Sequence, residues 1–236
     1  MNHISVSLQK KRKLLYLKIQ KAANKTNRSV NDIKVVAVTK SQPSPIWDFA
    51  FSNYFSILAE NRIKETKEKQ AYCVNRNKIE LHMIGRIQSN KAKQAVDMFD
   101  VIQTVDSLKL ANRINNISKD QSKTSNIFLQ VNSSKDPLKQ GFSIEKIFQV
   151  IPYIDALENL KVCGIMTIPH NNLKEDKLRD VYKLTREIRD KIYDMGIKNC
   201  TNLSMGMSGD FEIAIEEGST HVRIGTALFG GMNKWS

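Results

Sequence analysis

The sequence predicts an α/β protein whose eight parallel strands close into a (β/α)8 (TIM) barrel, with an extra N-terminal helix. Two observations carry this prediction: eight short runs rich in apolar and β-branched residues, and stretches of helical periodicity between most of them. The runs are continuously apolar, as expected for strands buried on both faces. A doubly wound open sheet shows the same alternation, so counting strands leaves it open as the alternative.

Eight strands are expected, with successive starts about 20 to 40 residues apart, as in a chain that alternates strands with helices. Their ranges are 33–38, 55–59, 81–84, 101–105, 127–131, 162–166, 201–204 and 221–224. The spacing leaves room for a helix after each strand, which is what parallel pairing of consecutive strands requires.

Helices are expected at 5–27, 43–53, 61–74, 89–98, 106–118, 143–157, 173–195 and 209–217. The first is basic and amphipathic. The second begins with prolines, which suit a first helical turn. Asp106 and Ser143 are suited to open the helices that they precede. Gly196 and Gly218 follow two of the helices and are natural residues for ending them.

Length and composition bound the kind of protein. The chain has 236 residues, of which 41% are hydrophobic, and no linker rich in Pro, Gly or Ser divides it. We therefore expect a single domain over 1–236, with the basic helix in 1–30 and the barrel in 33–230.

No run is long and apolar enough to span a membrane, and no secretory signal is evident, so a cytoplasmic protein is expected. The three cysteines and four histidines show no metal-ligand spacing.

The formal net charge of +13 invites a nucleic-acid-binding interpretation. More than half of this charge lies in residues 1–32, where eight Lys and Arg face one Asp. No basic stretch is interleaved with aromatic residues that could stack on bases. Solvated lysine faces on helices explain the charge better, and no nucleic-acid partner is expected.

Glycines cluster after the seventh and eighth expected strands. Gly206 and Gly209 follow the seventh strand, and Gly225 follows the eighth. In a barrel these two loops commonly form a phosphate site, because backbone N–H groups at helix starts bind anions. Ser208 and Thr226 could add hydroxyl and backbone donors. The alternative is that these glycines only make tight turns, but two such loops at the expected positions favour a phosphate site.

A lysine ends the first expected strand. Val38-Thr39-Lys40 places the Lys40 amine at the mouth of the barrel, where a partly apolar pocket would lower its pKa and make it nucleophilic. A nucleophilic lysine beside a phosphate site suggests pyridoxal 5′-phosphate (PLP), an aldehyde that is held as a Schiff base and anchored by its phosphate. The alternative is a solvent-exposed lysine that begins a loop.

Several motifs occur in an order that resembles a known family. They are Ala37-Val38-Thr39-Lys40, Ala59-Glu60-Asn61, His82-Met83-Ile84-Gly85, Gln88-Ser89-Asn90-Lys91, Gln130-Val131-Asn132, Gly164-Ile165-Met166, Leu203-Ser204-Met205-Gly206-Met207-Ser208 and Arg223-Ile224-Gly225-Thr226. From about Lys34 to Gly230 the chain resembles the YggS/PROSC-type PLP homeostasis proteins, which share the barrel of the alanine racemase N-terminal domain.

The resemblance implies a role for each matched residue. Lys40 is expected to form the Schiff base with PLP, Asn61 to lie beside the cofactor, and Arg223 to face the pyridine nitrogen. An arginine at that nitrogen does not favour its protonation, which weakens the ring as an electron sink.

The same resemblance assigns the phosphate site. Ser208 and the backbone of Gly225 and Thr226 are expected to hold the phosphate, with Ser204 nearby. Two arginines depart from the family pattern: Arg62 stands where tyrosine is usual, and Arg86 stands where proline is usual.

The resemblance also bears on catalysis. Racemisation by two bases needs a proton-transfer group on each face of the substrate. Classical racemases supply a tyrosine from a C-terminal domain, and this chain stops at Ser236, just after the eighth strand. We therefore expect a monomeric carrier that stores PLP or delivers it in transient contacts with apo-enzymes, not an enzyme. A PLP-dependent racemase or lyase is the alternative.

Overall fold

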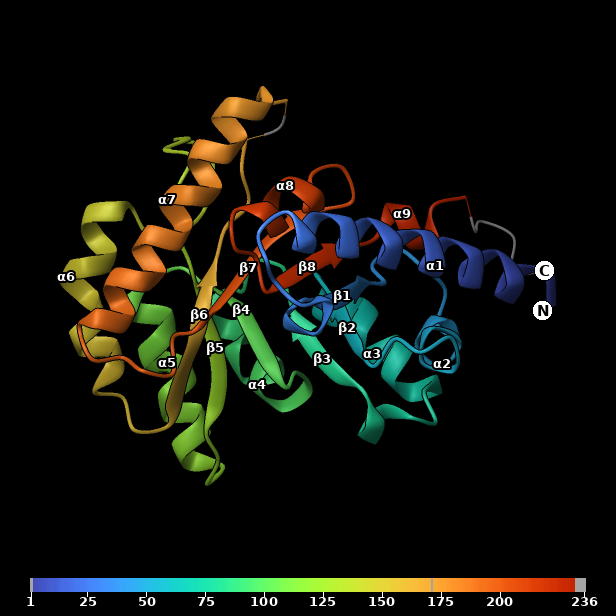
Figure 1. Ribbon diagram of the computed structural model, residues 1–236. Helices are drawn as coiled ribbons and strands as arrows, with labels where there is room; N and C mark the ends of the chain where they lie inside the picture. Colours follow the sequence, from blue (N-terminus) through green and yellow to red (C-terminus); the bar gives the residue numbers. More distant parts are fainter. Residues whose placement is uncertain (1, 171, 232–236) are drawn as a thin grey trace.

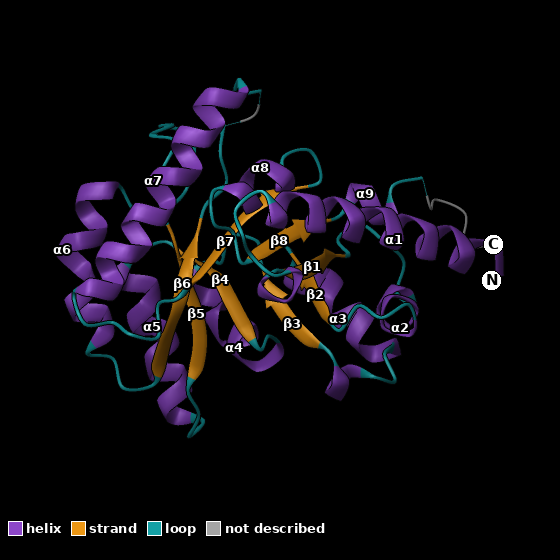
Figure 2. Ribbon diagram, viewed as in Figure 1, coloured by secondary structure: helices purple, strands orange, loops and turns teal. Residues whose placement is uncertain are grey.

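The computed structural model describes residues 2–170 and 172–231 of the chain. Eight parallel strands pair in sequence order, and the first pairs with the last, which closes the barrel. The predicted barrel is confirmed, and the open-sheet alternative is excluded because β1 and β8 are hydrogen-bonded neighbours. Figure 2 shows the strands on the inside, with helices around them.

The strands occur where they were predicted, with ends shifted by a few residues. They are β1 Lys34–Val38, β2 Ile57–Glu60, β3 Glu80–Met83, β4 Val101–Val105, β5 Ser125–Gln130, β6 Leu160–Met166, β7 Asn202–Met207 and β8 His221–Ile224. The largest difference is in β7, which continues beyond Ser204 through Gly206 to Met207. The pairing of β7 with β8 shifts in register between Ser204 and Met207, so the predicted loop glycine lies in an irregular part of the strand.

The helices also follow the prediction. They are α1 Asn2–Asn24, α2 Ile46–Ser52, α3 Ile63–Tyr72, α4 Ala92–Met98, α5 Leu108–Asp120, α6 Ile144–Asp155, α7 Glu175–Asp194, α8 Phe211–Glu216 and α9 Thr226–Phe229. Three short 3-10 turns, η1 Val30–Asp32, η2 Arg76–Lys78 and η3 Ser89–Lys91, join some of them to the strands. The short α9 was not predicted.

Local capping explains where two helices begin. The hydroxyl of Ser143 accepts a hydrogen bond from the N–H of Lys146, so the predicted start of α6 is confirmed. For α5 the cap is Ser107, whose hydroxyl accepts from the N–H of Leu110. The helix therefore begins at Leu108, two residues later than the expected start at Asp106, because the hydroxyl of Ser107 satisfies a free backbone donor.

The N-terminal helix lies against the outside of the barrel alongside α8 and α9 (Figure 1). Its expected apolar face, Leu8, Leu15, Ile19 and Ala22, is buried. No helix within the described residues is both long and apolar enough to cross a membrane.

Charge complementarity accompanies this packing. Lys18 pairs with Glu212 at 3.2 Å and Lys25 with Glu216 at 2.5 Å, and both acids belong to α8. Lys11 donates to the backbone carbonyl oxygens of Leu228 and Gly230. Part of the positive charge concentrated near the N-terminus therefore forms ion pairs and hydrogen bonds within the molecule. Its partners are acidic and carbonyl groups that follow β7 and β8.

Candidate functional site

A cavity of about 300 Å³ lies at the carboxyl ends of the strands, where barrel sites are normally built. Its lining residues come from the ends of β1, β2, β3, β7 and β8 and from the segment after β6. They are Val38, Lys40, Asn61, Ile84, Gly85, Ile168, Met207, Ser208, Gly209, Arg223, Gly225 and Thr226. Six of the seven residues predicted from the sequence thus meet in one cavity; the seventh, Ser204, does not line it.

Lys40 lies two residues beyond the end of β1, and its side chain is exposed. Lys40 therefore borders the cavity from its open side, beside the apolar lining residues Val38 and Ile84. The residue before it is fixed instead: Thr39 is fully buried, its N–H donates to the carbonyl oxygen of Ala59, and its hydroxyl donates to Glu60 at 2.6 Å. A rigid strand end thus carries a reachable amine.

A buried ionic network fixes Thr39, and the sequence analysis did not predict it. The Nζ of Lys69 in α3 donates to the carbonyl oxygen of Thr39 and to Oε1 of Glu60, both at 2.7 Å. The indole N–H of Trp47 in α2 donates to the same carboxylate oxygen at 3.1 Å. Lys69 is 3% exposed and Glu60 is fully buried. The signal that could have revealed the network is the acidic residue that ends an otherwise apolar strand.

Arg223 supplies a buried cation to the cavity. Its guanidinium donates from Nη1 to the carbonyl oxygen of Ser204 at 2.6 Å and from Nη2 to that of Thr167 at 2.8 Å. Burial lowers the pKa of Arg223 from its ordinary value, while the nearby Tyr182 and Asp210 oppose this shift. Because its hydrogen bonds hold it to β7 and to the residue that follows β6, Arg223 keeps one orientation toward the cavity.

Ser204 serves Arg223 and not the cavity itself. It is fully buried, and its hydroxyl accepts from Nη1 of Arg223 at 2.8 Å while donating to Oε1 of Gln103 at 2.7 Å. The amide of Gln103 lies 2.6 Å from Nδ1 of His82, whose Nε2 lies 2.6 Å from Glu80. Since an amide nitrogen only donates, His82 accepts at Nδ1 and donates to Glu80 from Nε2.

The loops after β7 and β8 meet at the end of the cavity that the sequence assigned to a phosphate. The hydroxyl of Ser208 accepts a hydrogen bond from the N–H of Ala227, at the start of α9. Gly206, just before this loop, allows α8 to pack closely on β7, because its φ is +90° and a Cβ there would lie 2.5 Å from Cβ of Ala214. The prediction that the two loops lie together is confirmed.

Asn61 follows β2 and lines the cavity. It lies against Gly85, where a Cβ would come within 2.0 Å of the carbonyl oxygen of Asn61. Only glycine at this position allows the ends of β2 and β3 to come this close. Arg62, the next residue, does not line this cavity; it lines a neighbouring one that Asn61 also borders.

Comparisons with known proteins agree with this geometry. The family model for the alanine racemase N-terminal domain matches residues 18–233. A pyridoxal phosphate homeostasis protein of Haemophilus influenzae is 33% identical over 233 residues, covering 97% of each chain. The chain belongs to the pyridoxal phosphate homeostasis proteins, within the alanine racemase N-terminal domain family. A relative of the same description from Synechocystis sp. is 35% identical over 198 residues, covering 84% of this chain and 91% of the relative.

Solved structures of similar fold include one that contains PLP. PipY of Synechococcus elongatus with PLP bound is 28% identical, has a TM-score of 0.81, and is matched over 90% of this chain and 100% of its own. An alanine racemase of Clostridium difficile has a TM-score of 0.76 at 17% identity, and the match covers 97% of this chain and 58% of the racemase. The second likeness shows that the two proteins share the barrel fold.

Proposed function

We propose that this protein binds PLP in the cavity at the carboxyl ends of the strands and holds it for delivery to PLP-dependent apo-enzymes. The observation that carries the proposal is that the Lys40 amine and the two glycine-bearing loops after β7 and β8 border one cavity of about 300 Å³. This volume is at the lower end of the range for small-molecule sites and suits a single-ring phosphate ester.

The residues present fit the groups of PLP one by one. Lys40 supplies an amine for the aldehyde, and Ser208 with the backbone of Gly225 and Thr226 supplies donors for the phosphate. Arg223, held by Ser204 and Thr167, supplies a fixed cation for the pyridine nitrogen, and Asn61 an amide at the side of the ring. When bound, PLP would supply an electrophilic aldehyde and a conjugated ring. The bound PLP of PipY and the similarity to pyridoxal phosphate homeostasis proteins support this assignment.

We propose further that the protein has little catalytic turnover of its own. Among the described lining residues, Lys40 is the only side chain suited to take and return a proton; the others offer amide, hydroxyl, guanidinium or apolar groups. Tyr182 is of the residue type that classical racemases use as the second base, but it is fully buried in α7. Burial together with Asp210 raises the pKa of its phenol. A phenol held protonated and away from the cavity does not serve as a second base.

The absorption spectrum tests the binding proposal. Wild-type protein loaded with PLP is expected to be yellow, and borohydride reduction is expected to fix the cofactor on the peptide that contains Lys40. Lys40→Ala is expected to lose both the colour and the adduct. Lys34→Ala is the matched control, because Lys34 is an exposed lysine at the other end of the same strand. An unchanged adduct in Lys40→Ala would overturn the assignment.

Hydrogen exchange tests the absence of turnover. PLP-loaded protein is incubated with L-amino acids in deuterated water, and loss of the Cα proton is followed by NMR. Exchange no faster than with free PLP is expected. Exchange at enzymatic rates that disappears in Lys40→Ala would establish the racemase or lyase alternative.

A further inference from the structure

A second and larger cavity adjoins the proposed PLP site. It has a volume of about 850 Å³, and Asn61 borders both cavities. Three helical segments begin around it: α3 after Arg62, η3 after Gln88, and α5 after Ser107. The proposed function of the smaller cavity makes no use of this space.

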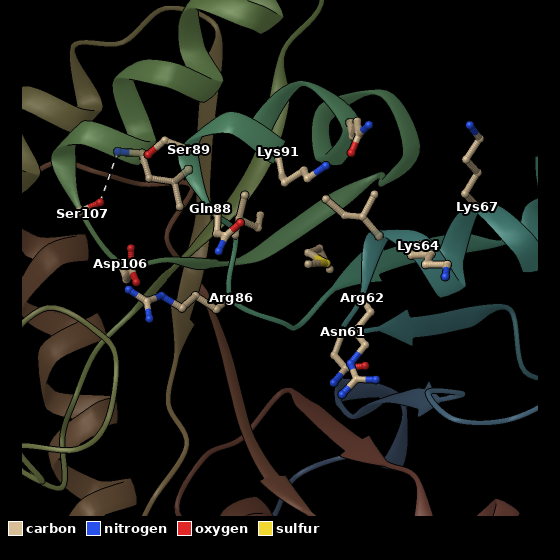
Figure 3. Close-up of a pocket in the computed structure, with 15 residues that line it drawn as sticks. Asn61, Arg62, Lys64, Lys67, Arg86, Gln88, Ser89, Lys91, Asp106 and Ser107 are labelled. Atoms are coloured by element: carbon tan, nitrogen blue, oxygen red, sulfur yellow. Dashed lines mark hydrogen bonds between the residues drawn. The ribbon is translucent and has the colours of Figure 1, made fainter.

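Five positively charged side chains line this cavity, against one acid among its described lining residues. We call this group the basic basin, defined by Arg62, Lys64, Lys67, Arg86 and Lys91; the acid is Asp106. Figure 3 shows Arg86 directed toward Asp106, and Lys91 extending from η3 toward α3, which carries Lys64 and Lys67. The cations thus come from both sides of the cavity and not from one run of sequence.

Most of these cations have no acidic partner. In the described part of the chain, no acceptor lies within hydrogen-bonding distance of the charged groups of Lys64, Lys67, Arg86 or Lys91. Arg62 pairs with Glu65 at 3.2 Å, and its side chain is 72% exposed. Concentrating unpaired like charges around a hollow is unfavourable for the free protein, and an anion in the hollow would relieve it.

The floor of the basin is apolar. Met83, Ile87 and Leu110 line it and are each no more than 6% exposed. Backbone donors add to the cations at the edge, because α3 begins at Ile63 without a side-chain cap. An apolar floor below cations on two sides fits a ligand with an organic ring and more than one negative group.

We propose that the basic basin binds an organic polyphosphate of nucleotide size, with its phosphates at the lysines and its ring over the apolar floor. The volume is appropriate for such a ligand and exceeds that of the adjacent PLP cavity almost threefold. Because Asn61 borders both cavities, an occupant of the basin would lie next to the proposed PLP site. The inference does not depend on the smaller cavity holding PLP.

Calorimetric titration of the full-length protein with ATP, pyrophosphate and inorganic phosphate at low ionic strength tests the proposal. ATP is expected to bind more tightly than pyrophosphate, and pyrophosphate more tightly than phosphate, with affinity that falls as salt is added. The triple variant Lys64→Gln, Lys67→Gln, Lys91→Gln is expected to weaken ATP binding about tenfold. The matched control is Lys93→Gln, Lys109→Gln, Lys119→Gln, which removes the same charge from exposed lysines outside the basin and is expected to change affinity less than about twofold.

Further titrations distinguish ATP binding in the basic basin from ATP binding in the smaller cavity and from binding of an acidic peptide. Lys40→Ala is expected to bind ATP as the wild type does, because Lys40 lines only the smaller cavity. Loss of ATP binding in this variant would put ATP in the smaller cavity and overturn the proposal. The proposal also fails if wild-type protein does not bind ATP, or if the control triple variant loses as much affinity as the basin variant. Tighter binding of a poly-glutamate peptide than of ATP would assign the basin to an acidic protein segment instead.

Discussion

Arg223 donates two hydrogen bonds to Ser204, one to its carbonyl oxygen at 2.6 Å and one to its hydroxyl at 2.8 Å. The hydroxyl of Ser204 in β7 also donates to Gln103 in β4. The series of hydrogen bonds continues from Gln103 to His82 and from His82 to Glu80, both in β3. The arginine assigned to the pyridine nitrogen is therefore oriented by a polar chain that runs across the inside of the barrel.

Replacing Ser204 with alanine tests this chain. The change removes one partner from Arg223 and one from Gln103 while leaving the cavity lining intact, so we expect PLP affinity to fall about fivefold, equivalent to about 1 kcal/mol. Equilibrium titration followed by the visible absorbance of bound PLP measures it. Ser7→Ala, an exposed serine in α1, is the control. Equal affinity of Ser204→Ala and wild type would show that Arg223 does not need this support.

The buried pair of Lys69 and Glu60 predicts a large effect on stability. Lys69→Met leaves the Glu60 carboxylate buried without its cation, so the free energy of unfolding should fall by about 3 to 5 kcal/mol. Urea denaturation followed by circular dichroism measures it, with the exposed Lys93→Met as control. Adding Glu60→Gln to Lys69→Met should restore part of the loss, because the uncompensated charge is then gone. A double variant no more stable than the single one would mean that the pair acts through packing and not through charge.

Two glycines near the proposed phosphate loop form a matched pair. Gly206→Ala places a Cβ 2.5 Å from Cβ of Ala214 at a φ of +90°, whereas a Cβ at Gly209 meets no atom within 4 Å. We expect Gly206→Ala to lower the free energy of unfolding by about 1 to 3 kcal/mol and to weaken PLP binding. Gly209→Ala should change stability by less than about 0.5 kcal/mol. Thermal unfolding with and without PLP compares the two, and similar melting temperatures would contradict the close packing of Gly206 against α8.

His221 predicts a dependence of stability on pH. Burial, together with the nearby His82 and Lys34, lowers its pKa to about 3 in the folded protein from an ordinary 6.5. The unfolded chain therefore binds a proton below pH 6.5 that the folded protein excludes, so stability is complete above pH 6.5 and is lost as pH falls toward 3. The contribution of this one group is about 1.4 kcal/mol per pH unit within that window.

The measurement is the free energy of unfolding in urea between pH 4.5 and 8. His221→Gln should be less stable than wild type at pH 8 but should lose less stability on acidification. His170→Gln, whose side chain is 56% exposed in the wild type, should follow the wild-type slope. Parallel curves for wild type and His221→Gln would show that this histidine is not the acid-sensitive group.

Sequence patterns predicted the barrel because its strands are buried on both faces and so remain continuously apolar. They also predicted that Lys40, Asn61 and the two glycine-bearing loops lie together, since the carboxyl ends of parallel strands share one end of a barrel. The pattern did not predict that β7 continues through Gly206, because glycine ordinarily marks a loop and the register shift in this part of the strand leaves no sequence pattern. The four-residue α9 was too short to show a periodicity.

The side-chain partnerships could not be predicted in the same way. The pairing of Lys69 with Glu60 depends on how α3 packs on β2, and a lysine in a charged helix is ordinarily solvated. The role of Ser204 depends on Gln103, which is 101 residues distant in sequence. The basic basin likewise takes its lysines from α3 and η3, and only the barrel places these segments around one hollow.

The contacts of α1 with α8 and α9 have a consequence for the order of folding. The hydrogen bonds of Lys11 with Gly230 and of Lys25 with Glu216 close loops of 219 and 191 residues. Such distant partners meet late, because the entropy of ordering the intervening chain must be lost before their contacts form. The elements that follow β7 and β8 are therefore expected to settle in the slowest phase of refolding. Competence to retain PLP should develop with that phase, after most of the helical signal has already returned.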